Sequence, residues 1–122
     1  MQQLDLGSFS MSLNVNDINV SLAFYLTLGF QVVDGGHINS SFPDTELSKW
    51  RVLKNGETTI GLYQGMLRNN VMTFNPKDVR SIQQRLKFMG VSLLKEADMD
   101  GNGADSIVLI DPDGNQILMD QH

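Results

Sequence analysis

The sequence predicts an α+β protein built from two copies of a β-α-β-β-β module. A strand-like alternation followed by a helical pattern occurs twice, about 60 residues apart, and each helical pattern ends at a glycine, Gly29 or Gly90. Two turn signals, Asn55-Gly56 and the Asp-Pro-Asp-Gly-Asn stretch at 111–115, each join two apolar segments. The chain of 122 residues predicts a single domain over 1–122, with module one at about 7–65 and module two at about 69–122.

The first module begins with a strand at residues 9–15, where apolar and polar residues alternate. A helix follows to about Leu28, with Asp17 or Asn19 as its cap. Residues at helical spacing predict its core face: Val20, Ala23, Phe24 and Leu28. Three further strands are expected at 30–33, 49–54 and 58–63, and both residues of the Asn55-Gly56 turn are expected at positive φ.

The second module repeats this order. Residues 71–75 predict a strand, and Asn75 is expected to cap a helix whose first residue is Pro76. The apolar stripe of this helix is Val79, Ile82, Leu86 and Met89. Strands are expected at 91–94, 106–110 and 116–120.

Composition excludes several classes of function. A net charge of −5 argues against a nucleic-acid partner, which usually meets a basic face. With no cysteine, the chain has no disulfide, thiolate metal site or cysteine nucleophile, which fits a cytoplasmic location. No apolar run approaches the roughly 20 residues that cross a membrane, and residues 1–5 do not resemble a secretory signal. We therefore expect no membrane partner.

The segments 17–30 and 111–119 together resemble the vicinal oxygen chelate superfamily, which includes glyoxalase I, extradiol dioxygenases, and fosfomycin- and bleomycin-resistance proteins. The resemblance covers nearly the whole chain. It implies that each module curls into a half-barrel, and that the two form a curved mixed sheet around a pocket with the helices outside. Small members of the family commonly dimerise, so the resemblance also implies a homodimer.

The resemblance further implies four metal-ligand positions, on the first and last strands of each module. In metal-dependent relatives they carry histidines and glutamates, and the divalent ion polarises substrate oxygens. Carried over one at a time, the positions fall on Ser10, Gly61, Asn69 (Asn70 if the register slips by one) and Leu118. None of these side chains is a good ligand for zinc, nickel or iron, so we expect no metal and no cofactor.

The leading expectation is therefore a metal-independent small-molecule-binding protein resembling the bleomycin-resistance branch, which sequesters a toxic compound or metabolite. Gly61 leaves room for a ligand, and the long 34–48 loop with Phe42 is a candidate lid. The ligand is expected to be neutral or cationic, and apolar or aromatic in part. The predicted lining is Ser10, Ser12, Asn14, Trp50, Tyr63, Asn69, Thr73 and Leu118.

Two other functions stay open. One is a glyoxalase-like lyase, isomerase or dioxygenase with a non-standard metal site, for which His37 with Asp44 or Glu46 is the candidate. The other is a structural or regulatory protein in which Trp50 and Tyr63 fill the half-barrel or a dimer contact. No nucleophile stands beside a base in the sequence, so no catalytic residue is named.

Residues 98–103 match the opening of a calcium loop, with oxygen-bearing side chains at alternate positions and a glycine at the sixth. The closing glutamate of such a loop would fall on Leu109. We therefore predict an ordinary solvated turn there.

Overall fold

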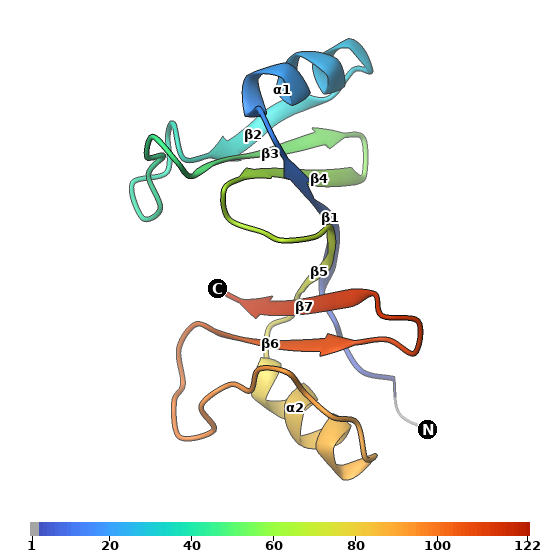
Figure 1. Cartoon of the computed structure of the whole chain (residues 1–122). Coiled ribbons are helices and arrows are strands. Elements are labelled where there is room, and N and C mark those ends of the chain that lie inside the picture. The colour runs from blue at the N-terminus through green and yellow to red at the C-terminus, as the bar shows by residue number, and fades with distance from the viewer. Residues whose placement is uncertain (1–2) are drawn as a thin grey trace. The chain divides into compact units, whose positions relative to one another are not determined.

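The structure is a computed structural model and describes residues 3–122. Seven strands and two helices follow one another within these residues (Figure 1), and the predicted α+β class is confirmed. The chain divides into two compact units. The N-terminal unit is Ser10–Asn70, and the C-terminal unit comprises Val71–His122 with the described residues up to Phe9. Neither helix is long and apolar enough to cross a membrane.

The two modules have the same strand connections. In each, the first strand pairs in parallel with the last, and the last pairs antiparallel with the strand before it. The first module has the strand order β2-β3-β4-β1 and the second has the order β5-β7-β6. The first module consists of β1 (Ser8–Val15), α1 (Ile18–Thr27), β2 (Gln31–Gly35), β3 (Lys49–Asn55) and β4 (Thr58–Gln64). The second consists of β5 (Val71–Asn75), α2 (Val79–Phe88), β6 (Asp105–Ile110) and β7 (Gln116–Gln121).

The same side-chain contact ties the helix of each module to its last strand. Gln64, the last residue of β4, accepts a hydrogen bond through Oε1 from the Ile18 N–H at 2.9 Å. Gln121, the last residue of β7, accepts one from the Val79 N–H at 2.8 Å. The first N–H groups of a helix have no partner within the helix. Each glutamine therefore satisfies one of them and links a strand end to a helix start.

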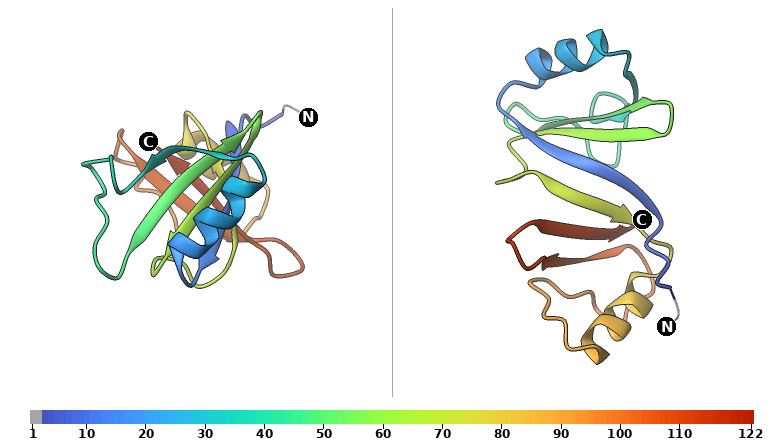
Figure 2. Two further views of the ribbon diagram at one scale, coloured as in Figure 1. Left: turned by 90° about the horizontal axis from the view of Figure 1, so that it is seen from above. Right: turned by 90° about the vertical axis from the view of Figure 1, so that its right-hand side faces the viewer.

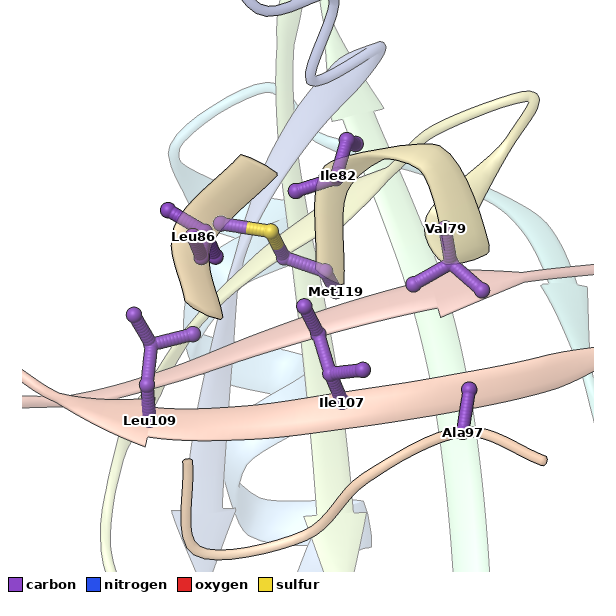
Figure 3. Packing of buried hydrophobic residues seen from close by; sticks show 7 residues of the cluster. All are labelled: Val79, Ile82, Leu86, Ala97, Ile107, Leu109 and Met119. Atoms are coloured by element: carbon purple, nitrogen blue, oxygen red, sulfur yellow. The ribbon is translucent and has the colours of Figure 1, made fainter. Parts of the chain in front are cut away.

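Each module buries one face of its sheet under its helix. In the C-terminal unit α2 covers β6 and β7, and its predicted stripe is confirmed at Val79, Ile82 and Leu86, while Met89 is exposed (Figure 3). Ile107, Leu109 and Met119 face these residues from the strands (Figure 3). In the N-terminal unit the buried cluster is Ile18, Leu53, Ile60 and Leu62.

The predicted core face of α1 is wrong. Ile18 is buried, and Leu22 and Tyr25 pack against the same cluster, so the helix turns a different face to the sheet. Val20, Phe24 and Leu28 are 67%, 58% and 55% exposed. Helical spacing could not choose between the faces, because α1 contains no charged residue and apolar side chains lie on both sides.

The start of α2 also differs from the prediction. Asn75 belongs to β5, and its amide donates to the Asp120 carbonyl at 2.9 Å, so it is not the helix cap. The helix begins at Val79 instead, and the side chain of Asp78 accepts a bond from the Ser81 N–H at 3.1 Å. Pro76 lies before the helix in the connection.

The hairpin between β3 and β4 is present, but its turn lies one residue later than predicted. Asn55 pairs with Thr58, so the two turn residues are Gly56 and Glu57. Only Gly56 has a positive φ, +58°. A glycine at the first of two turn residues suits the hairpin twist. The 111–115 turn lies between β6 and β7 as predicted, and there the Asp111 carboxylate accepts bonds from the Asp113 and Asn115 N–H groups.

The strand predicted at 91–94 is not formed. Only Lys95 makes a bridge, with Val108 of β6. At Ala97, two residues after Lys95, the backbone is bonded not to a neighbouring strand but to the buried side chain of Gln83. It accepts from the Ala97 N–H at 2.7 Å and donates to the Ala97 carbonyl at 3.2 Å. A side-chain amide from α2 therefore holds the backbone of Ala97, which the local sequence could not indicate.

Replacing Gln83 by Leu is expected to lower the free energy of unfolding by about 2–4 kcal/mol, because two buried backbone groups lose their partner. Urea denaturation followed by circular dichroism measures this. Gln84, the next residue on the same helix, is exposed and gives the matched control. Gln84→Leu should change stability by no more than about 0.5 kcal/mol. Equal effects of the two substitutions would contradict the proposed role of the Gln83 amide.

Candidate functional site

The face of the N-terminal unit opposite its core brings several predicted residues together. Strand register places Ser12 beside Gly61, and Asn14 beside Tyr63. Trp50 of β3 pairs with the same Tyr63 from its other side. Successive side chains of a strand point to opposite faces. Since Met11, Leu13 and Val15 pack on the core, Ser12 and Asn14 lie on the opposite face.

An aromatic pair forms the centre of this face. The rings of Trp50 and Tyr63 are nearly parallel, with an interplanar angle of 5° and centroids 6.4 Å apart. The Tyr63 ring folds back over Gly61, where an added Cβ would lie 2.5 Å from Tyr63 Cε2 and 3.0 Å from its hydroxyl oxygen. A side chain at position 61 would therefore have to displace the Tyr63 ring from this position. The space expected to receive a ligand beside Gly61 is therefore taken by the Tyr63 ring.

The loop after β2 is fixed to Trp50 and its neighbour. The indole Nε1 of Trp50 donates to the Phe42 carbonyl at 2.8 Å, and the Trp50 N–H donates to the Asp44 carboxylate at 3.3 Å. Asp44 also forms an ion pair with Arg51 at 2.8 Å, and both side chains are mostly buried. These bonds place the backbone of Phe42 beside the indole. In this structure the loop expected to act as a lid therefore lies next to the aromatic pair.

At the end of β1 the predicted residue Asn14 contacts the loop before β5, while the side chain of the predicted residue Asn69 in that loop forms no hydrogen bond to β1 within the described residues. Asn14 donates its N–H to Asn70 Oδ1 at 2.9 Å and its side-chain amide to the Arg68 carbonyl at 3.4 Å. Asn70, the alternative position, is therefore the residue that contacts β1. Asn69 is exposed in the preceding loop. Ser10 is half-buried on the same strand face as Ser12.

The remaining predicted residues lie in the C-terminal unit. Thr73 of β5 pairs with Leu118 of β7, which in turn pairs with Val108. Asp120 lies two residues after Leu118 and so shares its face. Burial raises the pKa of the Asp120 carboxyl, against the charges of His122 and Lys95. The alternation of β7 was sufficient to identify Asp120, but it was not among the predicted residues.

The proposed alternatives for a metal site gain no support from the geometry. Within residues 3–122 no three His, Asp or Glu side chains are placed to hold one ion. His37 is exposed, and the Asp44 carboxylate is held by Arg51 and the Trp50 N–H. The positions to which the resemblance assigns the metal ligands are Ser10, Gly61, Asn69 (or Asn70) and Leu118, whose side chains supply no imidazole or carboxylate. The residues present therefore do not fit the family's metal.

The segment that opens like a calcium loop surrounds an arginine. Arg80 of α2 donates to the carbonyl oxygens of Asp98 and Gly103, at 2.7 and 2.8 Å. The guanidinium group also faces the Asp105 carboxylate at 3.5 Å. Five of the six residues at 98–103 are exposed, as the predicted solvated turn requires, and Arg80 adds contacts to its backbone that were not predicted.

Asp105 is the anchor of this arrangement. Its carboxylate accepts bonds from the N–H groups of Asp98 and Ser106 and from the Lys95 ammonium. These bonds, that from Asp98 first, hold the pKa of Asp105 well below its ordinary value of 3.8. The charged form is therefore the one that the fold stabilises.

Two shallow crevices lie away from the predicted lining. They run along the N-terminal segment, beside Leu4 and Asp5, and one continues against α2 at Lys77, Ser81 and Arg85. None of the residues predicted to contact a ligand lines them. Each unit therefore has its own set of residues, with Ser12, Asn14, Trp50 and Tyr63 on one strand face of the N-terminal unit, and Leu118 and Asp120 on one strand face of the C-terminal unit.

Comparison with known proteins identifies the family that this fold represents. The family model described as the Glyoxalase/Bleomycin resistance protein/Dioxygenase superfamily matches residues 7–119. No curated protein matches the chain.

Solved structures with a similar fold include a glyoxalase/bleomycin resistance protein/dioxygenase superfamily member from Vibrio splendidus 12B01, with a TM-score of 0.64 and 18% identity over 93% of this chain and 97% of that one. A hypothetical protein from Bacillus halodurans C-125 has a TM-score of 0.68 and 18% identity over 93% and 91%. Methylmalonyl-CoA epimerase from Mycobacterium tuberculosis has a TM-score of 0.64 and 17% identity over 99% and 92%. At these identities the likeness establishes the fold alone.

Substituting Ala for Gly61 is expected to displace the Tyr63 ring and separate it from Trp50, because the new Cβ cannot lie 2.5 Å from the ring. Trp50 is the sole tryptophan, so its emission spectrum reports this directly. We expect a red shift and a loss of about 1 kcal/mol of stability, the size of an aromatic pair. Gly103→Ala is the control, since a Cβ there meets nothing within 4 Å. Unchanged emission in Gly61→Ala would show that the ring is placed differently.

The Asp105 contacts predict a specific pH dependence. A carboxyl whose pKa is lowered by folding stabilises the fold above its unfolded pKa, and this contribution is lost as the pH falls below it. Asp105→Asn should therefore lower the melting temperature at pH 7, and its deficit relative to wild type should shrink as the pH falls below about 4. Thermal denaturation from pH 2 to 8 tests this. Asp113→Asn, in the exposed 111–115 turn, is the matched control.

Proposed function

The chain belongs to the glyoxalase/bleomycin resistance protein/dioxygenase superfamily, and on that premise we propose that it is a metal-independent protein that binds a small molecule. Binding itself is then the activity, as in bleomycin-resistance proteins, and the ligand is a toxic compound or metabolite that is sequestered. This fold hosts many reactions, so the proposal depends on the residues of the site rather than on the fold.

The arrangement of Tyr63 over Gly61 is the observation that carries the proposal. The resemblance to the family places a glutamate ligand at position 61. Here the position has no side chain, and the phenol ring of Tyr63 covers it and stacks beside Trp50. A charged ligand position is thus replaced by an aromatic surface. Such a surface binds ligands through contact area and ring stacking, for which no metal is needed.

The flanking groups indicate the kind of ligand. Ser12 and Asn14 add polar groups on the same strand face as the aromatic pair. The C-terminal unit has a strand face of its own, on which Thr73 and Leu118 offer one polar and one apolar contact and Asp120 adds a carboxylate. Ring faces and carboxylates both favour positive charge over negative charge. We therefore expect a ligand with a flat ring system that is neutral or cationic.

A second candidate is an enzyme, a glyoxalase-like lyase or isomerase or a dioxygenase with a non-standard metal site. The half-buried Asp120 favours it, because a carboxyl with a raised pKa near a binding surface is a common general base. The fold likeness to a methylmalonyl-CoA epimerase is compatible with such a role.

Homodimer formation and a cytoplasmic location also remain predictions.

Ligand binding is tested by a thermal-shift screen of flat aromatic compounds, with Trp50 fluorescence as the second readout. A ligand at 100 times its dissociation constant should stabilise the fold by about 2.7 kcal/mol and quench or shift the emission. Tyr63→Leu should weaken binding about 10-fold or more, while Phe88→Leu, at a 90% exposed residue of α2, should leave it unchanged. If Tyr63→Leu binds the ligand as tightly as wild type does, Tyr63 does not contact the ligand.

Elemental analysis of protein purified without added metal separates the two candidate functions. We expect less than a stoichiometric amount of nickel, zinc, iron or manganese, before and after soaking. One tightly held ion per chain would refute metal independence. Asp120→Asn should then lose that ion if Asp120 belongs to the enzyme site.

A further inference from the structure

Two Asn-Gly pairs occur in the sequence, at 55–56 and at 102–103. An asparagine that precedes glycine is open to a reaction of its own side chain, because glycine has no Cβ that would block the approach of its nitrogen to the asparagine amide carbon. The two pairs lie in different structural settings. Those settings decide at which pair the reaction proceeds.

Asn55 is held in place by its neighbours. It ends β3 and pairs with Thr58 of β4 across the hairpin. Its side-chain nitrogen donates to the Leu28 carbonyl at 3.2 Å, at the end of α1. The Asn55 amide group therefore has a fixed partner, and turning it toward the Gly56 nitrogen would break that bond.

Asn102 is not held in this way. Its side chain is exposed, and within residues 3–122 neither this side chain nor the Gly103 N–H forms a hydrogen bond. A Cβ added at Gly103 would meet nothing within 4 Å, so the space around the glycine is open. Figures 1 and 2 show the segment in orange, in the connection that leads from α2 to β6. No bond of either reacting group has to be broken before the two approach one another.

We propose that Asn102 is a site of spontaneous covalent modification, at which the Gly103 nitrogen attacks the Asn102 side-chain amide. A bond forms between the Gly103 nitrogen and Asn102 Cγ, the Cγ–Nδ2 bond breaks, and ammonia leaves with the proton of the glycine nitrogen. The product is a cyclic imide. Water then opens the ring at either carbonyl, which gives aspartate in one case and isoaspartate, with the main chain passing through Cγ, in the other.

The position of the pair gives the modification a structural consequence. Arg80 donates to the carbonyl oxygens of Asp98 and Gly103, at 2.7 and 2.8 Å, so it bridges two points on either side of Asn102. Isoaspartate adds a carbon atom to the main chain between these points, whereas aspartate changes the charge alone. Isoaspartate at position 102 therefore weakens the Arg80 contacts, and aspartate leaves them in place.

Incubation of the full chain in mildly alkaline buffer, followed by tryptic digestion and mass spectrometry, tests the proposal. Trypsin places the two Asn-Gly pairs in separate peptides, 55–68 and 96–122. Fragmentation should locate the mass gain of an amide-to-acid conversion at Asn102, with several-fold less conversion at Asn55. Equal or faster conversion at Asn55 would overturn the proposal.

Gly103→Ala is the matched control. The added methyl group hinders the approach of the nitrogen, and the open space at this position accommodates it, so conversion of Asn102 should slow several-fold while the circular dichroism spectrum stays unchanged. Conversion at an unchanged rate would show that the Gly103 nitrogen is not the attacking group, which also overturns the proposal.

The structural consequence has a test of its own. Chains that contain isoaspartate are separated chromatographically from the aspartate form, and Asn102→Asp supplies the added charge without the longer main chain. The isoaspartate form should melt about 3–5 °C below Asn102→Asp, the shift expected when a chain of this size loses one hydrogen bond. Equal melting temperatures would refute the link between the modification and the Arg80 contacts.

Discussion

The bond between a strand-terminal glutamine and a helix N-terminus, made by Gln64 and again by Gln121, is the constraint on which the arrangement of each module depends. The first strand leads into the helix within a few residues, so the start of the helix lies near the end of the parallel last strand. The glutamine joins these two points and stabilises the parallel register, in which Val15 lies beside Gln64. A one-residue slip of a strand reverses the faces of all its side chains. The same contact therefore supports the register, set by the apolar face of β1, in which Ser12 and Asn14 share a face with Gly61 and Tyr63.

The sequence pattern was sufficient to predict the buried face of an element where charged and apolar residues lie on different sides of it. The stripe of α2 could be identified because charged residues occupy its other side, and the paired modules could be identified because their turns contain glycine and aspartate. The buried face of α1 could not, because no charged residue of that helix marks the solvent side. The irregular 91–97 segment depends on the Gln83 amide, which comes from a helix that precedes it in the chain.

In the candidate site, strand alternation predicts which face a side chain lies on but not how that side chain is oriented on the face. Strand alternation places Trp50, Tyr63 and Ser12 on one face once the register is known. The direction in which a ring folds does not follow from alternation, and the Tyr63 ring turns back along β4 to cover Gly61. Arg80 gives a parallel case, since the sequence predicts a turn at 98–103 but not that an arginine from α2 donates to two of its carbonyl oxygens.

The packing of Tyr63 against Gly61 also has an evolutionary consequence. A side chain at position 61 and the phenol ring in its present position need the same space. A carboxylate regained there by substitution would have to push the ring aside, and the ring's stacking beside Trp50 would be lost with it. A return to a charged ligand position therefore costs the present aromatic surface, whereas a change at a flanking residue alters what that surface binds and leaves the surface in place.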